Sequence, residues 1–318
     1  MKADGSPTPL TLELLGLARK LASSLGKKVV ALLLGSGIAE GAEELARSGA
    51  DEVFLADDAG LAEYNPDVYL PLLAAFCERE RPAVILAGHT SLGQDLLPRL
   101  AFSLGAGLVT DCVGLEIDNA TGGVAFTRPV YGGNALATQK ATTATAMATV
   151  RARVGEAPPP DGAGEVTPLD LPLPPAARIE VKGRVHEESR ECPLEEAPVV
   201  VSGGRGMGGE EGFERLRELA SLFGGAVGAS RPPVDSGWAP TTCQVGITGK
   251  VVAPAIYIAV AISGSSQHLS GMGESGKVVA INKDPDAYIF QVSDYGVVGD
   301  WKQVLPAFTA KLRELLVQ

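Results

Sequence analysis

The run Tyr257–Asp300 constrains the fold more than any other part of the chain. Its first apolar stretch, Tyr257–Ile262, stops at Ser263 and leads into small and polar residues and a short helical pattern. Its second, Lys277–Ile281, stops at Asn282, whose side chain can bond a ribose or a base edge. A strand that turns into a helix through small residues leaves free backbone N–H groups, which bind phosphate. The run therefore predicts a site for a phosphate-bearing ligand.

Helical and strand-like patterns alternate along most of the remaining chain. Helices are expected at Leu10–Leu25, Ala39–Ser48, Tyr69–Arg81, Gly93–Leu104, Glu210–Phe223 and Val304–Leu316. Strands are expected at Lys28–Leu34, Glu52–Leu55, Ala83–Ala87, Pro198–Val201 and Ala226–Ala229. This alternation predicts an α/β protein whose mostly parallel sheets are covered by helices.

The middle of the chain departs from this rhythm. Gly123–Arg128 and Thr143–Arg151 are strand-like runs joined by Gly-rich turns, which suggests an antiparallel extension of the sheet. The Pro- and Gly-rich stretch Glu156–Ala176 is a connection or an extended strap, because it cannot continue a helix or a central strand. Ile179–Val185 is predicted to be one more strand. The polar, acidic segment Glu187–Glu196 marks the boundary between two domains.

These patterns predict a nucleotide-binding-like α/β domain over residues 1–193 and a doubly wound parallel-sheet domain over residues 194–318. The formal net charge of −11 argues against nucleic acid as a partner. No apolar stretch of about 18 residues is present, so no membrane insertion is expected, and no secretory signal is visible. The four cysteines are scattered and form no C-x-x-C, which argues against a metal site and fits the cytoplasm.

Two arginines, one between glycines and one before two prolines, are candidates for ligand binding. Gly204–Gly209 satisfies G-x-G-x-x-G between a predicted strand and helix, so that Arg205 would meet phosphate; a tight turn with a solvated arginine is equally compatible. The acidic residue expected about 20 positions later is absent, which disfavours a conventional NAD site. Arg231 follows the strand Ala226–Ala229 and precedes two prolines. It is either a fixed charge beside a bound ligand or a surface residue.

A tight loop and a histidine are the other candidates. In the loop Gln244–Lys250, Thr248 could donate its hydroxyl to a ligand, although a hairpin turn explains the glycines as well. A lone histidine is more often a packing or surface residue, as expected for His89 and His186. His268 differs because it shares its turn with three serines and a glutamine, and its imidazole could bond a ligand carbonyl. No catalytic triad or pair of carboxylates stands out, so the pattern is typical of a cofactor holder.

Five motifs, in order and with their spacing, resemble those of electron transfer flavoprotein alpha subunits. They lie at Val201–Gly206 (VSGGRG), Gly228–Arg231 (GASR), Gln244–Lys250 (QVGITGK), Pro254–Met272 and Ile281–Asp300. The resemblance implies one FAD in the C-terminal domain and a heterodimer with a beta subunit. Such pairs carry electrons singly from a dehydrogenase, commonly of the acyl-CoA type of fatty acid beta-oxidation, to a membrane-bound quinone reductase. The chain would then be an electron carrier rather than a stand-alone enzyme.

The same resemblance implies a set of FAD-site residues. They are Arg205, Ser230, Arg231, Val245, Gly246, Ile247, Thr248, Ser263, Gly264, Ser265, Ser266, Gln267, His268, Asn282, Asp300 and Trp301. The serine turn would hold the pyrophosphate, while Arg231, Thr248 and His268 would surround the isoalloxazine. Asn282 and Asp300 would meet the adenosine end. No metal site is implied.

The chain departs from the family pattern at three places. Ile247 stands where the family usually has Gln, and Ala261 replaces a usual Gly. An apolar strand usually precedes the equivalent of Asp4-Gly5, whereas only Met1–Ala3 do so here; a missing strand would leave a gap in the sheet. An electron-bifurcating subunit that uses NADH and a non-redox adenine-nucleotide regulatory module remain alternatives.

Overall fold

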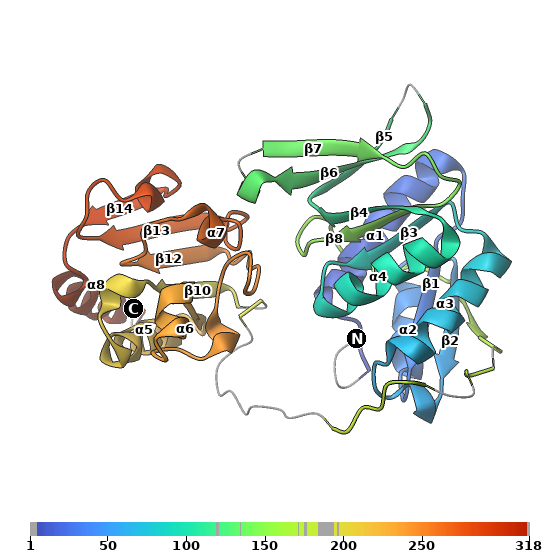
Figure 1. The fold of residues 1–318 in the computed structure, drawn as a ribbon, viewed down its shortest axis with the longest axis horizontal. Coiled ribbons are helices and arrows are strands. Elements are labelled where there is room, and N and C mark those ends of the chain that lie inside the picture. The colour runs from blue at the N-terminus through green and yellow to red at the C-terminus, as the bar shows by residue number, and fades with distance from the viewer. Residues whose placement is uncertain are drawn as a thin grey trace. The chain divides into compact units, whose positions relative to one another are not determined.

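The computed structural model describes residues 5–118, 121–133, 135–170, 172–174, 177–183, 194–195 and 197–316. The chain divides into two compact units (Figure 1). The first comprises Met1–Val130 and Leu136–Arg184, and the second comprises Tyr131–Ala135 and Val185–Gln318. None of the helices in the described part of the chain is both long and apolar enough to cross a membrane. The domain boundary placed between residues 193 and 194 stays a prediction.

The first unit holds two three-stranded parallel sheets. One has the order β1-β2-β9, with bounds Val30–Gly35, Glu52–Asp57 and Glu165–Pro168. The other has the order β3-β8-β4, with bounds Val84–Gly88, Ala146–Val150 and Gly107–Cys112. The helices are α1 (Pro9–Leu25), α2 (Ala39–Arg47), α3 (Pro66–Glu80) and α4 (Ser91–Leu104). All seven predicted helices and strands of residues 10–104 are confirmed within a few residues.

Both sheets are covered by the same two layers. On one face, α1 packs Leu15 against Leu33 of β1 and packs Leu17 near Leu86 of β3. On the other face, the core between α3 and α4 contains apolar residues of β1 and of β3 together, such as Leu32. The two sheets are therefore halves of one helix-covered layer.

The facing edges of these halves, β1 and β3, have no strand partner among the described residues. Both strands are apolar (VALLLG and VILAG), and no residue of β3 is fully buried. By contrast, every residue of β8 and β10 (Val199–Gly203), which have a strand on each side, is buried. This separation of β1 from β3 resembles the gap that the sequence led us to expect, and residues 1–4 lie outside the described residues.

The antiparallel extension is smaller than predicted. β5 (Gly114–Ile117) and β6 (Val124–Val130) pair antiparallel and, with β7 (Ala135–Lys140), form a separate sheet. The run Thr143–Arg151 does not belong to it, so that part of the prediction was wrong: β8 lies parallel between β3 and β4. A fully buried strand such as β8 is typical of the centre of a parallel sheet.

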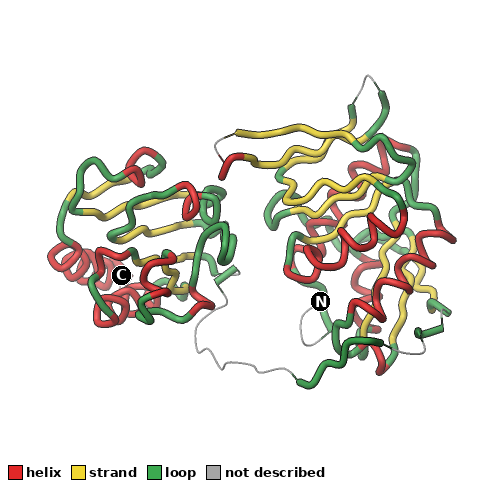
Figure 2. The backbone as a smooth tube through the Cα atoms, in the orientation of Figure 1, coloured by secondary structure: helices red, strands yellow, loops and turns green. Residues whose placement is uncertain are grey.

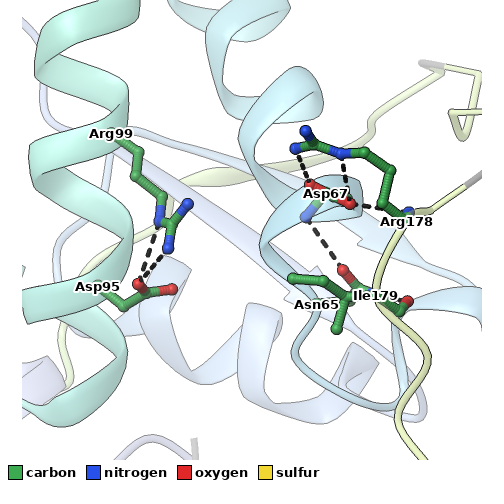
Figure 3. Close-up of polar contacts among 6 residues, drawn as sticks. All are labelled: Asn65, Asp67, Asp95, Arg99, Arg178 and Ile179. Carbon is green, nitrogen blue, oxygen red and sulfur yellow. Dashed lines mark hydrogen bonds and ion pairs between the residues drawn. The ribbon is translucent and has the colours of Figure 1, made fainter.

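The part of the strap that follows β9, together with its continuation to residue 183, has neither helix nor strand among its described residues (Figure 2). The predicted strand Ile179–Val185 was therefore wrong over 179–183, and Ile179 is 47% exposed. Side chains of the first turn of α3 hold the strap instead (Figure 3). Asn65 Nδ2 donates to the Ile179 carbonyl over 2.8 Å, and Asp67 accepts from the Arg178 guanidinium and backbone N–H. Arg178 holds the pKa of the Asp67 carboxyl below its usual value.

The second unit holds one five-stranded parallel sheet of order β11-β10-β12-β13-β14. The other strand bounds are Ala226–Ala229, Ile256–Val260, Lys277–Asn282 and Tyr295–Val298 for β11, β12, β13 and β14. α5 (Glu210–Leu222) and α8 (Trp301–Leu316) cover one face. The other face is covered by loops and short helices, including α7 (Ser266–Leu269). The predicted parallel α/β fold is confirmed. The edge strand β14, which has only four residues, all of them exposed, was not predicted.

Candidate functional site

The carboxyl edge of the second sheet gathers the predicted site residues. Because all five strands are parallel, their carboxyl ends meet at one edge. The chain runs from β10 outward to β11, then returns to β12 on the other side of β10, which makes a switch point between β10 and β12. Ligands of open α/β sheets bind at such a point. Most of the predicted residues lie at or just after the carboxyl ends of the five strands. The loop 245–248 instead follows Gln244, which forms an isolated parallel bridge with Ala229 at the end of β11.

Several helices that begin at this edge lack a side-chain cap. No side chain accepts from the first-turn N–H groups of α5, of α7 or of the 3₁₀ turn Arg205–Met207. α6 (Arg231–Asp235) also lacks a side-chain cap, but its second and third residues are prolines, which have no N–H to offer. In the first unit, Thr8, Asn65 and Thr90 cap α1, α3 and α4 through hydrogen bonds. Helix starts without a partner favour an acceptor from outside the chain, and an anion also suits the positive end of the backbone dipoles. The edge is therefore built for an anionic ligand that spans several turns.

The turns after β10 and β12 touch each other closely. A Cβ on Gly204 would lie 2.0 Å from the Ala261 carbonyl oxygen, so only glycine fits there. Ala261 itself has φ of 54°, in the left-handed region. Next to this contact lies a cavity of about 180 Å³. It is lined by Gly206, Met207, Gly208, Ala261, Ile281, Asn282, Lys283, Gly299, Asp300, Trp301 and Lys302.

Two arginines at the edge are available to a ligand. Arg205 is exposed and has no ion pair with any described residue. Among the described residues, Arg231 pairs only with Asp235, four residues later on α6, at 3.2 Å, and both side chains are more than 60% exposed. An exposed pair of this kind contributes little to stability, so a ligand can displace it at small cost. Ser230, just before it, is buried.

The loop 245–248 lies directly on the turn that follows β12. The Ile247 N–H donates to the Gln267 carbonyl at 2.8 Å, and Gly246 takes a φ of 142°. A Cβ on Gly246 would lie 2.7 Å from the same carbonyl oxygen. Ile247 is 62% exposed, so its side chain does not fill the core. The Thr248 hydroxyl is exposed and accepts from Gln244 Nε2 at 2.9 Å.

The serine turn and its histidine face opposite ways. Ser263, Ser265, Ser266 and Gln267 are exposed, and Gly264 has φ of 86°. His268 is only 4% exposed, and its two ring nitrogens lie 2.9 Å from the Tyr257 hydroxyl and 3.1 Å from the Val245 carbonyl. Burial lowers the pKa of His268 to about 4. The serine side chains can therefore meet a ligand directly, whereas the histidine nitrogens already have partners inside the protein.

Asn282, Asp300 and Trp301 line the cavity at the ends of β13 and β14. Asn282 donates to the Ile262 carbonyl at 2.8 Å and accepts from the Asp284 N–H at 3.0 Å, so its side chain shapes the turns. Asp300 accepts from the Lys302 N–H and thereby caps α8. Trp301 donates to the Gly206 carbonyl at 3.0 Å, which ties α8 to the Gly-rich turn.

Sequence reasoning missed two cations at this cavity. Lys283 follows β13 and Lys302 lies in the first turn of α8, and both are exposed. The signal for Lys283 was visible, because the residue follows the predicted strand end at Asn282. Lys302 could not be placed without β14, the strand that the sequence analysis omitted.

Comparisons with known proteins agree with this geometry. A family model described as the electron transfer flavoprotein domain matches residues 1–175. A second, described as the electron transfer flavoprotein FAD-binding domain, matches residues 193–273, which contain most of the site above. The chain belongs to the electron transfer flavoprotein alpha-subunit family.

Full-length relatives support the family assignment. An electron transfer flavoprotein subunit alpha of Thermoanaerobacterium thermosaccharolyticum is 42% identical over 98% of this chain and 96% of its own length. Protein FixB of Clostridium saccharobutylicum is also 42% identical, over 98% of this chain and 94% of its own. The lactate dehydrogenase (NAD(+),ferredoxin) subunit LctC of Acetobacterium woodii is 37% identical over 95% of this chain and 73% of its own.

The residues at the edge suit the flavin of this electron transfer flavoprotein family. The uncapped turns can take a pyrophosphate, and the exposed Arg205 and Arg231 can neutralise it or a reduced ring.

Proposed function

We propose that this chain is the alpha subunit of a heterodimeric electron carrier that binds one FAD non-covalently at the carboxyl edge of β10–β14. The observation that supports the proposal is the pair of uncapped turns that follow β10 and β12 at the switch point, together with two arginines available to a ligand. Bound flavin supplies one- and two-electron redox chemistry. The protein supplies position, charge and exclusion of water.

Different residues along the edge contact different parts of the FAD. The turn 263–267 holds the pyrophosphate through backbone N–H groups and serine hydroxyls, with Arg205 as the counter-charge. Asn282 and Asp300, at the cavity, serve the adenosine end. Arg231 and the loop 245–248 serve the ring, where Arg231 favours added negative charge and Thr248 offers a hydroxyl.

The assembly follows from the family. The chain pairs with a beta subunit in the cytoplasm and accepts electrons from a dehydrogenase, of the acyl-CoA type in fatty acid beta-oxidation, for delivery to a membrane quinone reductase. A second candidate has a specific motive: one relative is named as a subunit of a lactate dehydrogenase that uses NAD(+) and ferredoxin. In that bifurcating version, NADH would reduce the flavin of the pair.

The test is co-expression with the beta subunit and measurement of flavin identity, stoichiometry and reduction. One FAD released per alpha chain, and reduction by a dehydrogenase with its substrate, are expected. Arg231→Ala should lower the first reduction potential while flavin content stays constant. Arg313→Ala, on α8 and away from the edge, is the matched control. A colourless pair that binds only adenine nucleotides would favour the non-redox alternative, and rapid reduction by NADH would favour the bifurcating one.

A further inference from the structure

The start of α3 holds the segment that leads from β9 to the second unit, residues 169–193. Asp67 accepts three hydrogen bonds from Arg178, one from its backbone N–H at 2.8 Å and two from its guanidinium at 2.8 and 3.2 Å. Asn65 Nδ2 donates to the Ile179 carbonyl at 2.8 Å. We call these four residues the α3 clip (Figure 3). Because two of the bonds reach the backbone of the segment, the clip fixes the path of the chain as well as one side chain.

Asn65 serves both the helix and the segment. Its Oδ1 accepts from the Asp67 N–H at 3.0 Å, which caps α3, while its Nδ2 holds Ile179. Its side chain has both partners and the residue is only 8% exposed. Thr8 and Thr90, the caps of α1 and α4, accept from the first turns of their own helices. An aspartate would cap α3 as well but has no N–H for Ile179. The amide is therefore a cap that can also hold a second segment.

The ionic part of the clip is sheltered on the side of α3 only. The Asp67 side chain is 13% exposed, whereas that of Arg178 is 88% exposed. The guanidinium and backbone N–H of Arg178 hold the pKa of the Asp67 carboxyl below its usual value. A carboxylate that accepts from a guanidinium and from a backbone N–H is bound more strongly than one in a single exposed pair. The clip is therefore closed at neutral pH.

The clip is the last polar attachment of the segment to the first unit among the described residues. Before it, Leu169 is buried in the core of the first unit. After it, the described residues 180–183 form no hydrogen bond or ion pair with another described part of the first unit, since Lys182 pairs with Glu180 inside the segment. Leu194 is then buried in a core of the second unit. Residues 180–193 thus connect two fixed points.

We propose that the α3 clip sets the length of the tether between the two units. With the clip closed, residues 180–193 form the tether; with the clip open, residues 170–193 do so, which is about ten residues more. An extended chain spans at most 3.3–3.6 Å per residue, so opening adds roughly 35 Å to the greatest reach of the second unit. Residues at the start of α3 therefore limit how far the unit that carries the candidate site can move. The inference holds whatever ligand that unit binds.

The first test is limited trypsin digestion of the full chain. In the unaltered protein, cleavage after Lys182 should precede cleavage after Arg178, because the clip holds the backbone at Arg178 and Ile179. Asn65→Asp, which keeps the cap of α3, should speed the cut after Arg178 about fivefold, and Asp67→Ala about tenfold or more. Glu80→Ala, which removes a pair at the other end of α3, is the control and should change nothing.

Two outcomes of the digestion would overturn the proposal. One is a cut after Arg178 that comes first in the unaltered protein, a result that needs no variant. The other is an unchanged rate after Arg178 in both Asn65→Asp and Asp67→Ala, with circular dichroism showing that each variant is folded.

The second test is X-ray scattering of the full chain in solution. The double variant Asn65→Asp, Asp67→Ala should shift the distribution of interatomic distances to larger values than in the unaltered protein, whereas Glu80→Ala should not. Faster cleavage after Arg178 without this shift would show that the clip holds the segment but does not limit the tether, and the proposal would then be wrong.

Discussion

Ala261 combines an unfavourable backbone conformation with a place beside the cavity at the carboxyl edge of the second sheet. Its φ of 54° is costly for a residue with a Cβ, by roughly 1–2 kcal/mol. Ala261→Gly removes this cost but gives the unfolded chain more freedom, so we expect the free energy of unfolding to rise by about 0.5–1 kcal/mol. Urea denaturation measures the change. Ala229→Gly, in the buried strand β11, is the control and should lower stability. A loss of stability in Ala261→Gly would show that its methyl packing matters more.

His268 makes stability depend on pH. Its pKa is lowered from 6.5 to about 4 in the folded protein, so between these values the unfolded chain binds a proton that the folded chain does not. Stability is therefore complete above pH 6.5 and falls as pH drops, by on the order of 3 kcal/mol at pH 4. His268→Asn should remove this part of the slope. His89, whose pKa burial also lowers, remains in both proteins. Equal slopes would contradict the prediction.

Ile247 offers an apolar, exposed side chain next to Thr248, where the family usually has Gln. We expect Ile247→Gln to raise the first reduction potential of the bound flavin, because an amide can bond a reduced ring. The gain in reduction free energy should be at most that of one hydrogen bond to a charged group, about 1.5–3 kcal/mol. Since Ile247 is 62% exposed, melting temperature should hardly change. Potentiometric titration and thermal melting of one preparation give both values. An unshifted potential would mean that this side chain lies away from the ring.

The unpaired edges of β1 and β3 are the main unusual feature at the scale of elements. The start of α1 lies at their carboxyl ends: a Cβ on Gly5 would lie 2.8 Å from the Gly37 carbonyl oxygen, and Leu10 contacts the place of a Gly88 Cβ at 2.6 Å. A strand joined ahead of Gly5 and parallel to both would end at this point. It would reach β1 through α1, the usual crossover connection of parallel strands.

We therefore expect an added apolar strand ahead of Gly5 to stabilise the first unit. An extension of about six residues should fill the slot and raise the melting temperature by several degrees, since it pairs backbone groups of β1 and β3 that no described strand pairs. Amide exchange in β1 and β3 should slow. An extension of equal length with proline at alternate positions is the control, because proline cannot donate to the sheet. Equal melting temperatures for both extensions would show that the slot does not take a strand.

At the scale of the whole molecule, the second unit has its own sheet and two cores. One core lies between the sheet and α5 with α8, and the other lies around Tyr257 beneath the loops. We expect a fragment of residues 197–318 to fold cooperatively, which circular dichroism during urea unfolding measures. Ala197 is buried in the second core, so a fragment starting at residue 200, inside β10, is the control and should be less stable. A fragment without a cooperative transition would show that the two units fold together.

The parallel α/β pattern could be predicted from the sequence alone, as could the family and the strand ends that gather the candidate site residues. Apolar runs such as Ile256–Val260 and glycine turns such as 203–209 act locally, through periodicity and backbone conformation, and local effects are readable along the chain. The sequence did not reveal that Ala146–Val150 is a central parallel strand, because a short apolar run looks the same in any sheet. Nor did it separate the roles within the serine turn.

Those points depend on the packed fold. The structure shows that His268 is buried with both nitrogens bonded, while Ile247, in the loop beside it, is exposed. It also shows which helix starts lack a cap, and that β1 and β3 each have a free edge among the described residues. The physical reason is that burial, hydrogen-bond partners and strand neighbours depend on residues far apart in sequence. A pattern read along the chain places a residue at a strand end, but only the packed fold determines what that residue faces.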